Sequence, residues 1–165
     1  MVTWLQYLGF RPQTAQLKAI YIAEAGGQTM QAVNTASARV DQGLVGDRYA
    51  MNTGYWHRVE SCQVTLISEH DLQQARKREA IPLENGEHRR NLVIAGIKTK
   101  TLKHRRFQLG ECILAYHKPR PPCGYINQLT GSTMMEALRQ NSGICLKVLK
   151  SGSFAVGDPL ILLAD

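Results

Sequence analysis

The sequence predicts a mainly β fold: a β-barrel-like domain that carries about two inserted α-helices. Short apolar runs, rich in β-branched and aromatic residues, recur between glycine, proline and polar residues, as strands separated by turns do. Only two segments show the end signals of helices. The 165 residues are most simply one domain, 1–165, with enough chain to bury a core.

The first expected strands are three apolar runs. Residues 17–23 and 63–67 combine β-branched and aromatic side chains with a partial alternation of apolar and polar positions. That alternation is typical of strands buried on one face. Residues 92–94 form a shorter run, for which we expect a third strand.

The second half of the chain contains two pairs of strand-like runs. Residues 107–109 lead through a Gly–Glu step into 112–116, and residues 154–156 lead through a Gly–Asp step into 159–162. Each Gly–acid step predicts a tight turn or a bulge between strands. Pro159 stands at a strand start, where a missing N–H matters least.

Two helices are expected to interrupt the strands. Ser68 is a predicted N-cap for a helix over 69–80, which has acids in its first turn and bases near its end, as the helix dipole favours. A second helix is expected over 133–141, where Thr133 and Glu136 have the spacing of a capping box.

The chain carries a formal net charge of +7, and its cations are concentrated. Between His88 and Arg120, nine residues are Lys or Arg and only Glu111 is acidic. The densest part, 98–106, is either a solvated loop or a surface that binds an anion. A basic nucleic-acid-binding module is an alternative class, although the run has no interleaved aromatic residues to stack on bases.

Four cysteines, at positions 62, 112, 123 and 145, lack the close spacing of zinc knuckles or redox pairs. No secretory signal or membrane span is recognisable, so we expect a cytoplasmic protein with no disulfide framework and no membrane partner. Cys112 and Cys145 lie in apolar strings and are expected to be buried, whereas Cys62 opens a strand-like run with fewer cations around it than Cys123 has.

Cys123 is the strongest candidate for chemistry. Prolines at 119, 121 and 122 restrict the backbone before it, and Gly124 lets the chain turn away after it. Lys118 and Arg120 favour the thiolate, which is the form that attacks, carries sulfur or ligates a metal. The alternative is a small apolar residue in a loop.

Two further clusters contain candidate anion ligands. Asp47 and Arg48 follow two glycines in a loop that would present a guanidinium to a phosphate or a carboxylate. The same pair would equally pin the loop through a salt bridge. Arg90 and Asn91 lead directly into the expected strand 92–94, and Asn91 would serve either a turn or a ligand.

In their order and spacing, these motifs resemble the MOSC family, the domain named after the C-terminal part of molybdenum-cofactor sulfurases. The resemblance extends over roughly residues 17–163. It rests on the motifs Gly43-Leu44-Val45-Gly46-Asp47-Arg48-Tyr49, Val64-Thr65-Leu66-Ile67-Ser68-Glu69, Arg89-Arg90-Asn91-Leu92-Val93-Ile94-Ala95-Gly96, Phe107-Gln108-Leu109-Gly110-Glu111, Pro122-Cys123 and Gly157-Asp158.

The resemblance implies a barrel-like β fold in which Cys123 carries sulfur as a persulfide or ligates molybdenum. It implies the molybdenum cofactor, an anionic pterin, as the bound group. By position, Arg48, Arg90 and Asn91 would hold the cofactor's phosphate, with Arg120 as a further ligand.

Two reactions are compatible with the resemblance. As a sulfur carrier, the protein would be loaded by a separate pyridoxal-phosphate-dependent cysteine desulfurase. As a molybdenum-dependent reductase of N-hydroxylated substrates, it would need an external electron-donor protein.

One motif departs from the larger enzymatic relatives, which carry a His-Gly-Gly element after the Gly-Asp-Arg motif. This chain has Met51-Asn52-Thr53-Gly54-Tyr55-Trp56-His57 there, which indicates a short, stand-alone member. A domain that has lost its activity and only binds partners is a third alternative.

Overall fold

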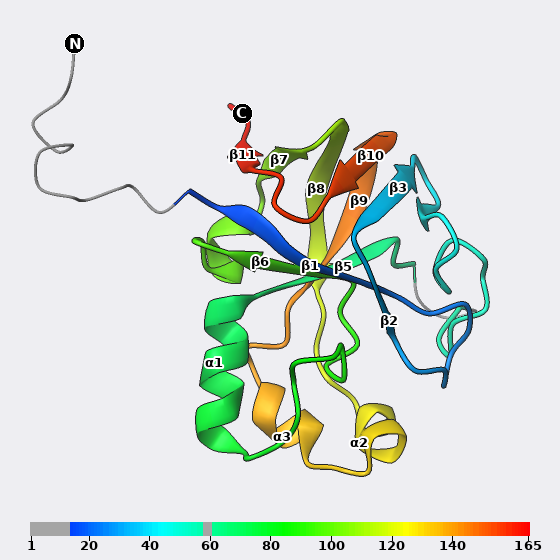
Figure 1. Cartoon of the computed structure of the whole chain (residues 1–165), viewed down its shortest axis with the longest axis vertical. Coiled ribbons are helices and arrows are strands. Elements are labelled where there is room, and N and C mark those ends of the chain that lie inside the picture. Colours follow the sequence, from blue (N-terminus) through cyan, green and yellow to red (C-terminus); the bar gives the residue numbers. More distant parts are fainter. Residues whose placement is uncertain (1–13, 58–60) are drawn as a thin grey trace, which may run out of the picture.

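The structure is a computed structural model that describes residues 14–57 and 61–165 (Figure 1). These residues form eleven strands and three α-helices, so the mainly β prediction is confirmed. The strands are β1 (Gln16–Ile22), β2 (Gln31–Val33), β3 (Thr35–Arg39), β4 (Gly43–Leu44), β5 (Val64–Ser68), β6 (Leu92–Ala95), β7 (Arg106–Leu109), β8 (Cys112–Pro119), β9 (Ile144–Lys150), β10 (Gly152–Ala155) and β11 (Leu160–Leu162). The helices are α1 (Glu69–Arg78), α2 (Gly124–Thr130) and α3 (Met134–Leu138), and a 3-10 turn, η2, covers Thr99–Leu102.

The strands form two sheets. The larger has eight strands in the order β11-β7-β8-β9-β5-β6-β1-β2, and the smaller has the order β10-β3-β4. All neighbours are antiparallel except β5 and β6, which run parallel and are connected through α1. The eight-stranded ladder does not close on itself within the described residues, so closure into a barrel stays a prediction.

Four strands were not predicted. Three of them, β2, β3 and β4, have two to five residues and carry no clear alternation of apolar and polar positions. The fourth, β9, has seven residues and lies between β5 and β8 near the middle of the large sheet. The apolar string at its start, which includes Cys145, was predicted to be buried, and Cys145 is fully buried.

The first predicted helix is confirmed with a shorter end. Helix α1 begins after Ser68, whose Oγ accepts a hydrogen bond from the backbone N–H of Asp71 at 3.2 Å. It ends at Arg78, two residues before the predicted end.

The second predicted helix is shorter still, because α3 covers only Met134–Leu138. The Thr133 side chain makes no capping bond, and the Asn127 side chain accepts from the Met135 N–H instead. Helix α2 was missed, because Gly124 starts this helix where the sequence suggested a turn.

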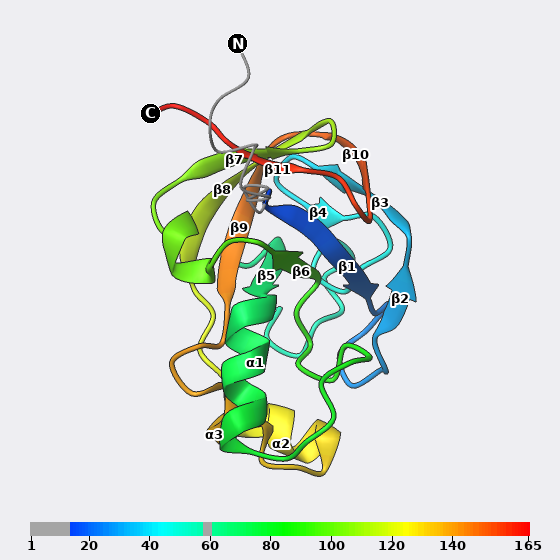
Figure 2. The same ribbon diagram turned by 60° about the vertical axis from the view of Figure 1, so that its left-hand side comes forward.

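The three helices gather at one end of the molecule, away from the end where β7 and β11 meet (Figures 1 and 2). One buried cluster fills the space between the sheets and includes Leu66, Phe107 and Leu146. A second cluster packs the helices on the large sheet through residues such as Ile67, Leu72 and Leu138. No helix in the described part of the chain has the length and apolar character needed to span a membrane.

Candidate functional site

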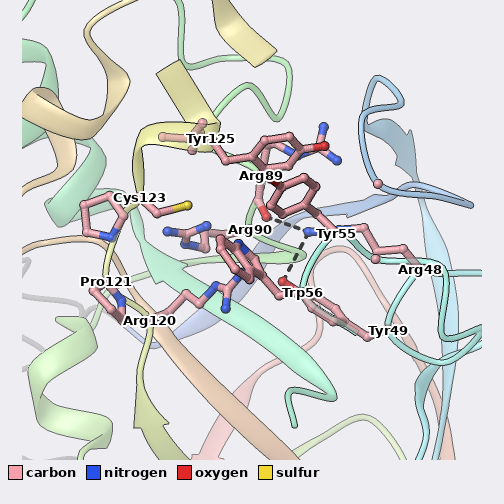
Figure 3. Close-up of a pocket in the computed structure, with 14 residues that line it drawn as sticks. Arg48, Tyr49, Tyr55, Trp56, Arg89, Arg90, Arg120, Pro121, Cys123 and Tyr125 are labelled. Atoms are coloured by element: carbon pink, nitrogen blue, oxygen red, sulfur yellow. Dashed lines mark hydrogen bonds between the residues drawn. The ribbon is translucent and has the colours of Figure 1, made fainter. Parts of the chain in front are cut away.

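One cavity brings together most of the predicted site residues (Figure 3). Cys123, Arg48, Arg90 and Arg120 all line it, although they come from three separate segments of the chain. Arg48 follows β4, Arg90 precedes β6, Arg120 follows β8, and Cys123 stands directly before α2. A fourth guanidinium, that of Arg89, lines the same cavity and was not predicted.

Cys123 is partly buried and is the N-cap residue of α2, with an extended backbone at φ −133° and ψ 165°. Its side chain makes no capping hydrogen bond to the helix. The first turn of α2 therefore does not use the sulfur, which Figure 3 shows on the same side as the guanidinium of Arg90.

The guanidinium of Arg48 is held by the protein itself. Its Nη1 donates to the carboxylate of Asp47 at 3.0 Å, and its Nη2 donates to the carbonyl of Arg89 at 3.1 Å. Asp47 is fully buried and also accepts from the N–H of Ala23 at 3.0 Å. Arg48 stacks over the ring of Tyr49 at 4.5 Å. The Asp47–Arg48 ion pair therefore fixes the loop and also places the Arg48 guanidinium at the cavity wall.

Arg90 is almost completely buried, with 3% of its surface exposed. Its Nε donates to the carbonyl of Ser142 at 2.6 Å, and its Nη2 donates to the Ser142 hydroxyl at 2.7 Å. Burial, followed by the charge of Arg120, lowers the pKa of Arg90 to about 10, which leaves it cationic at neutral pH.

Arg89 also carries a perturbed guanidinium. Burial, followed by the charge of Arg48, lowers its pKa to about 10. Its Nη1 donates to the carbonyl of Gln28 at 2.6 Å, and its backbone has a positive φ of 62°. The sequence placed Arg89 beside Arg90 in one motif, but nothing local showed that both guanidiniums would reach the cavity, since the positive φ of Arg89 depends on the surrounding fold.

The side chains that line the cavity carry a strong positive charge. Four guanidiniums line it, and none of the described lining residues is acidic. Asp47 is the acid bonded to this cluster, and it neutralises one charge at most. Closely spaced cations of this kind attract and hold an anion such as a phosphate.

Asn91 lies next to this cluster in sequence but does not line the cavity. Its Oδ1 accepts from the backbone and the hydroxyl of Thr65, each at 3.0 Å, and its Nδ2 donates to the carbonyl of Tyr21 at 3.0 Å. The side chain therefore ties β1, β5 and β6 together, which is a structural role.

Three aromatic residues at the cavity were also not predicted. The rings of Tyr55 and Tyr125 stack with centroids 3.8 Å apart and planes inclined by 16°, and Trp56 packs edge-on against Tyr55 at 4.8 Å. Tyr55 and Trp56 are neighbours of His57, whose Nδ1 is hydrogen-bonded to the carbonyl of Gly54. Tyr125 comes from α2, so only the fold reveals the stack.

The cavity is small, with a volume of about 50 Å³. That is room for one or two water molecules, whereas sites for whole organic ligands measure roughly 300–1,000 Å³. The stacked rings of Tyr55 and Tyr125 form part of its wall. A larger ligand therefore requires these rings to separate.

The cation-rich run 98–106 is not part of this cavity. Three of its lysines, Lys98, Lys100 and Lys103, line a different cavity of about 240 Å³ together with His70 and Tyr116. The predicted positive surface is thus split into two groups, and the group at Cys123 is made of arginines alone.

Comparison with solved structures shows which proteins share this fold. YuaD from Bacillus subtilis is similar with a TM-score of 0.73 at 16% identity, over 90% of this chain and 95% of that one. YiiM from Geobacillus stearothermophilus is similar with a TM-score of 0.69 at 16% identity, over 91% and 75%. YiiM from Escherichia coli gives a TM-score of 0.60 at 20% identity, over 91% and 70%.

The sequence comparisons are more specific. Curated proteins gave no significant match. The MOSC domain, in contrast, matches residues 53–161, which include Arg90, Arg120 and Cys123 and begin five positions after Arg48. Because this match covers most of the chain and agrees with the fold, the protein belongs to the MOSC domain family, which is associated with binding of the molybdenum cofactor.

Proposed function

We propose that this protein binds the molybdenum cofactor, or handles sulfur for it, through Cys123 and the arginine cluster. The proposal rests on one observation: the Cys123 thiol, which does not cap α2, lines the same cavity as four guanidiniums, and no described residue of that lining is acidic. Guanidiniums bind phosphate through paired hydrogen bonds, and a cysteine sulfur can act as a nucleophile or as a metal ligand.

The donor set fits the cofactor. A thiolate is a soft ligand of the kind that suits a heavy transition metal, and Cys123 would supply it. Arg120 and Arg90 would hold the anionic pterin phosphate. Arg48 and Arg89, each hydrogen-bonded to a backbone carbonyl of the protein, would add positive charge to the cavity wall. When bound, the cofactor would supply oxidation–reduction at its metal. The cavity volume requires Tyr55 and Tyr125 to separate when the cofactor binds.

The sulfur-carrier role uses the same residues without a metal. The Cys123 thiolate would attack the outer sulfur of a persulfide on a cysteine desulfurase, forming one S–S bond while the desulfurase thiol leaves. The resulting Cys-S-S⁻ carries a negative charge, which Arg90 and Arg120 would stabilise. The cavity, at about 50 Å³, has room for one additional sulfur atom.

Metal and pterin analysis tests the cofactor-binding role. Wild-type protein, Cys123→Ser and Cys112→Ser would be purified from a host that makes the cofactor, and molybdenum and oxidised pterin would be measured per chain. We expect both in wild type and in Cys112→Ser, whose altered cysteine lies outside the cavity, and loss of metal in Cys123→Ser. Absence of molybdenum and pterin from wild type would refute this role.

Persulfide loading tests the carrier role. A desulfurase and ³⁵S-labelled cysteine should transfer one sulfur to each chain, releasable by a reducing agent. Cys123→Ser should abolish the label, and Arg120→Ala should weaken its retention while Arg120→Lys partly restores it. Equal labelling of Cys123→Ser and wild type would refute Cys123 as the carrier.

A further inference from the structure

Two cysteines outside the candidate site meet in the core. Cys62 lies two residues before β5 and Cys145 lies on β9, and the thiol of Cys62 approaches the sulfur of Cys145 to 2.7 Å. The two positions are 83 residues apart in sequence. Cys145 is fully buried and Cys62 is 7% exposed. Strands β5 and β9 are adjacent, and Thr65 on β5 pairs with Cys145, so the segment before β5 lies close to this part of β9.

The pair lies next to residues that line the Cys123 cavity. Burial and Arg120 lower the pKa of Arg90, and a smaller opposite effect comes from Cys145. Burial raises the pKa of Tyr49, with a smaller contribution in the same direction from Cys62. Each sulfur is therefore within electrostatic range of a different cavity residue.

We propose that Cys62 and Cys145 are a redox modification site, which a two-electron oxidant such as hydrogen peroxide converts into a reversible intramolecular disulfide. Cys62, the more exposed of the two, attacks the peroxide as its thiolate, forming a sulfenic acid and releasing hydroxide. The Cys145 sulfur then displaces the hydroxyl group of that sulfenic acid. In total, two thiols and one peroxide give one disulfide and two water molecules, and a dithiol reductant reverses the change.

The disulfide would act on the arginine cluster. Ser142, which holds Arg90 through two hydrogen bonds, is three residues before Cys145. A bond between Cys62 and Cys145 would fix this part of β9 to the segment that enters β5. It would also close a long loop in the unfolded chain, which stabilises the folded state.

Oxidation of the cofactor-free protein tests the site. The experiment uses the Cys123→Ser variant, so that the thiol of the candidate site takes no part and the outcome is independent of the proposed function. After treatment with peroxide, the intact mass should fall by two hydrogens, and peptide mapping should join Cys62 to Cys145. The midpoint of thermal unfolding should rise by roughly 5–10 °C and return with dithiothreitol.

Matched variants in the same background provide the controls. Adding Cys62→Ala or Cys145→Ala should abolish both the mass change and the thermal shift, whereas Cys112→Ala should keep both. If Cys145→Ala does not fold because the side chain of Cys145 is fully buried, Cys62→Ala alone still tests the proposal. An unchanged mass in the Cys123→Ser protein, or a bond mapped to Cys112, would overturn the proposal.

Discussion

The buried guanidinium of Arg90 supports the site and the fold at once. Its two hydrogen bonds to Ser142 connect the segment before β6 to the segment before β9. A charged donor of this kind is worth more than a neutral one, and its loss leaves the acceptors without a partner in a dry environment.

Arg90→Ala should therefore lower the free energy of unfolding by about 2–4 kcal/mol, because the carbonyl and hydroxyl of Ser142 both lose their donor. Ser142→Ala removes only the hydroxyl and should cost about 1 kcal/mol. Urea titrations of both variants check the difference. A cost for Arg90→Ala no larger than that for Ser142→Ala would contradict the structural role.

Individual residues could be selected from the sequence only where local chemistry singled them out. Cys123 was identified by its prolines and cations, and Arg48 by the Asp–Arg pair after glycines. Tyr55 and Tyr125 carry no such signal, since their importance comes from a stack between residues 70 positions apart. Asn91 was chosen for its position, but its side chain bonds inside the core.

The start of β9 illustrates how a single position can constrain an element. Gly143 has a φ of 91°, and a Cβ atom there would lie 2.4 Å from the carbonyl oxygen of Leu66 on β5. Gly157 has a similar φ of 95°, but a Cβ atom there would meet nothing within 4 Å. The two glycines share the same backbone requirement and differ only in available space.

Gly157→Ala should cost about 1–2 kcal/mol of unfolding free energy, because only the left-handed backbone is penalised. Gly143→Ala should cost at least about 2 kcal/mol more, since β9 must also move away from β5. Chemical denaturation measures both values. Similar costs for the two variants would show that the contact with Leu66 relaxes freely.

At the level of elements, the Tyr55–Tyr125 stack connects α2 to the loop after β4. Removing one ring should make Cys123 more accessible to large reagents, because an aromatic pair contributes about 0.5–1.5 kcal/mol to the closed arrangement. Tyr125→Ala should raise the rate of modification by a fluorescein maleimide, relative to iodoacetamide, by a factor of about 2–10.

Tyr125→Phe serves as the control for this experiment, since it keeps the ring and should leave the ratio of the two rates unchanged. Peptide mapping would confine the measurement to Cys123. An unchanged ratio in Tyr125→Ala would mean that the stack does not limit access to the thiol.

Elements with strong local signals were predictable, and the others were not. Ser68 and the charge gradient after it predicted α1, and the apolar runs predicted β1, β5, β6, β7, β8, β10 and β11. Strand β9 was missed because its second half, Lys147–Lys150, places two apolar residues between two lysines and so lacks the alternation of a half-buried strand. Helix α2 was missed because a proline run precedes it and Gly124 is its first residue, although both are compatible with a helix start.

For the molecule as a whole, the buried His88 links stability to pH. It is fully buried, and its Nδ1 accepts from the N–H of Arg90 at 3.0 Å, so the ring is neutral. Burial, followed by the charges of Arg90 and Arg76, lowers the pKa of His88 to about 3 from its usual 6.5. Between these two values the unfolded chain binds a proton that the folded chain does not.

The free energy of unfolding should therefore fall as the pH is lowered below about 6.5, with His88 contributing up to about 1.4 kcal/mol per pH unit. The contribution is fully present above pH 6.5. In His88→Asn, whose Oδ1 replaces the Nδ1 acceptor, the fall between pH 6.5 and pH 4.5 should be smaller. Parallel urea titrations at several pH values compare the two slopes, and equal slopes would rule out His88 as the cause.

The position of β9 in the sheet also has a consequence for biosynthesis. This strand is flanked by β5 and β8, yet it is translated after both of them and after Arg48, Arg90 and Cys123. While a nascent chain ends before residue 144, β5 and β8 have no shared neighbour, and the thiol of Cys123 is not yet held beside the guanidiniums. The cavity at Cys123 is therefore completed only after β9 has been synthesised, so the thiol and the four guanidiniums come together late in the folding of this chain.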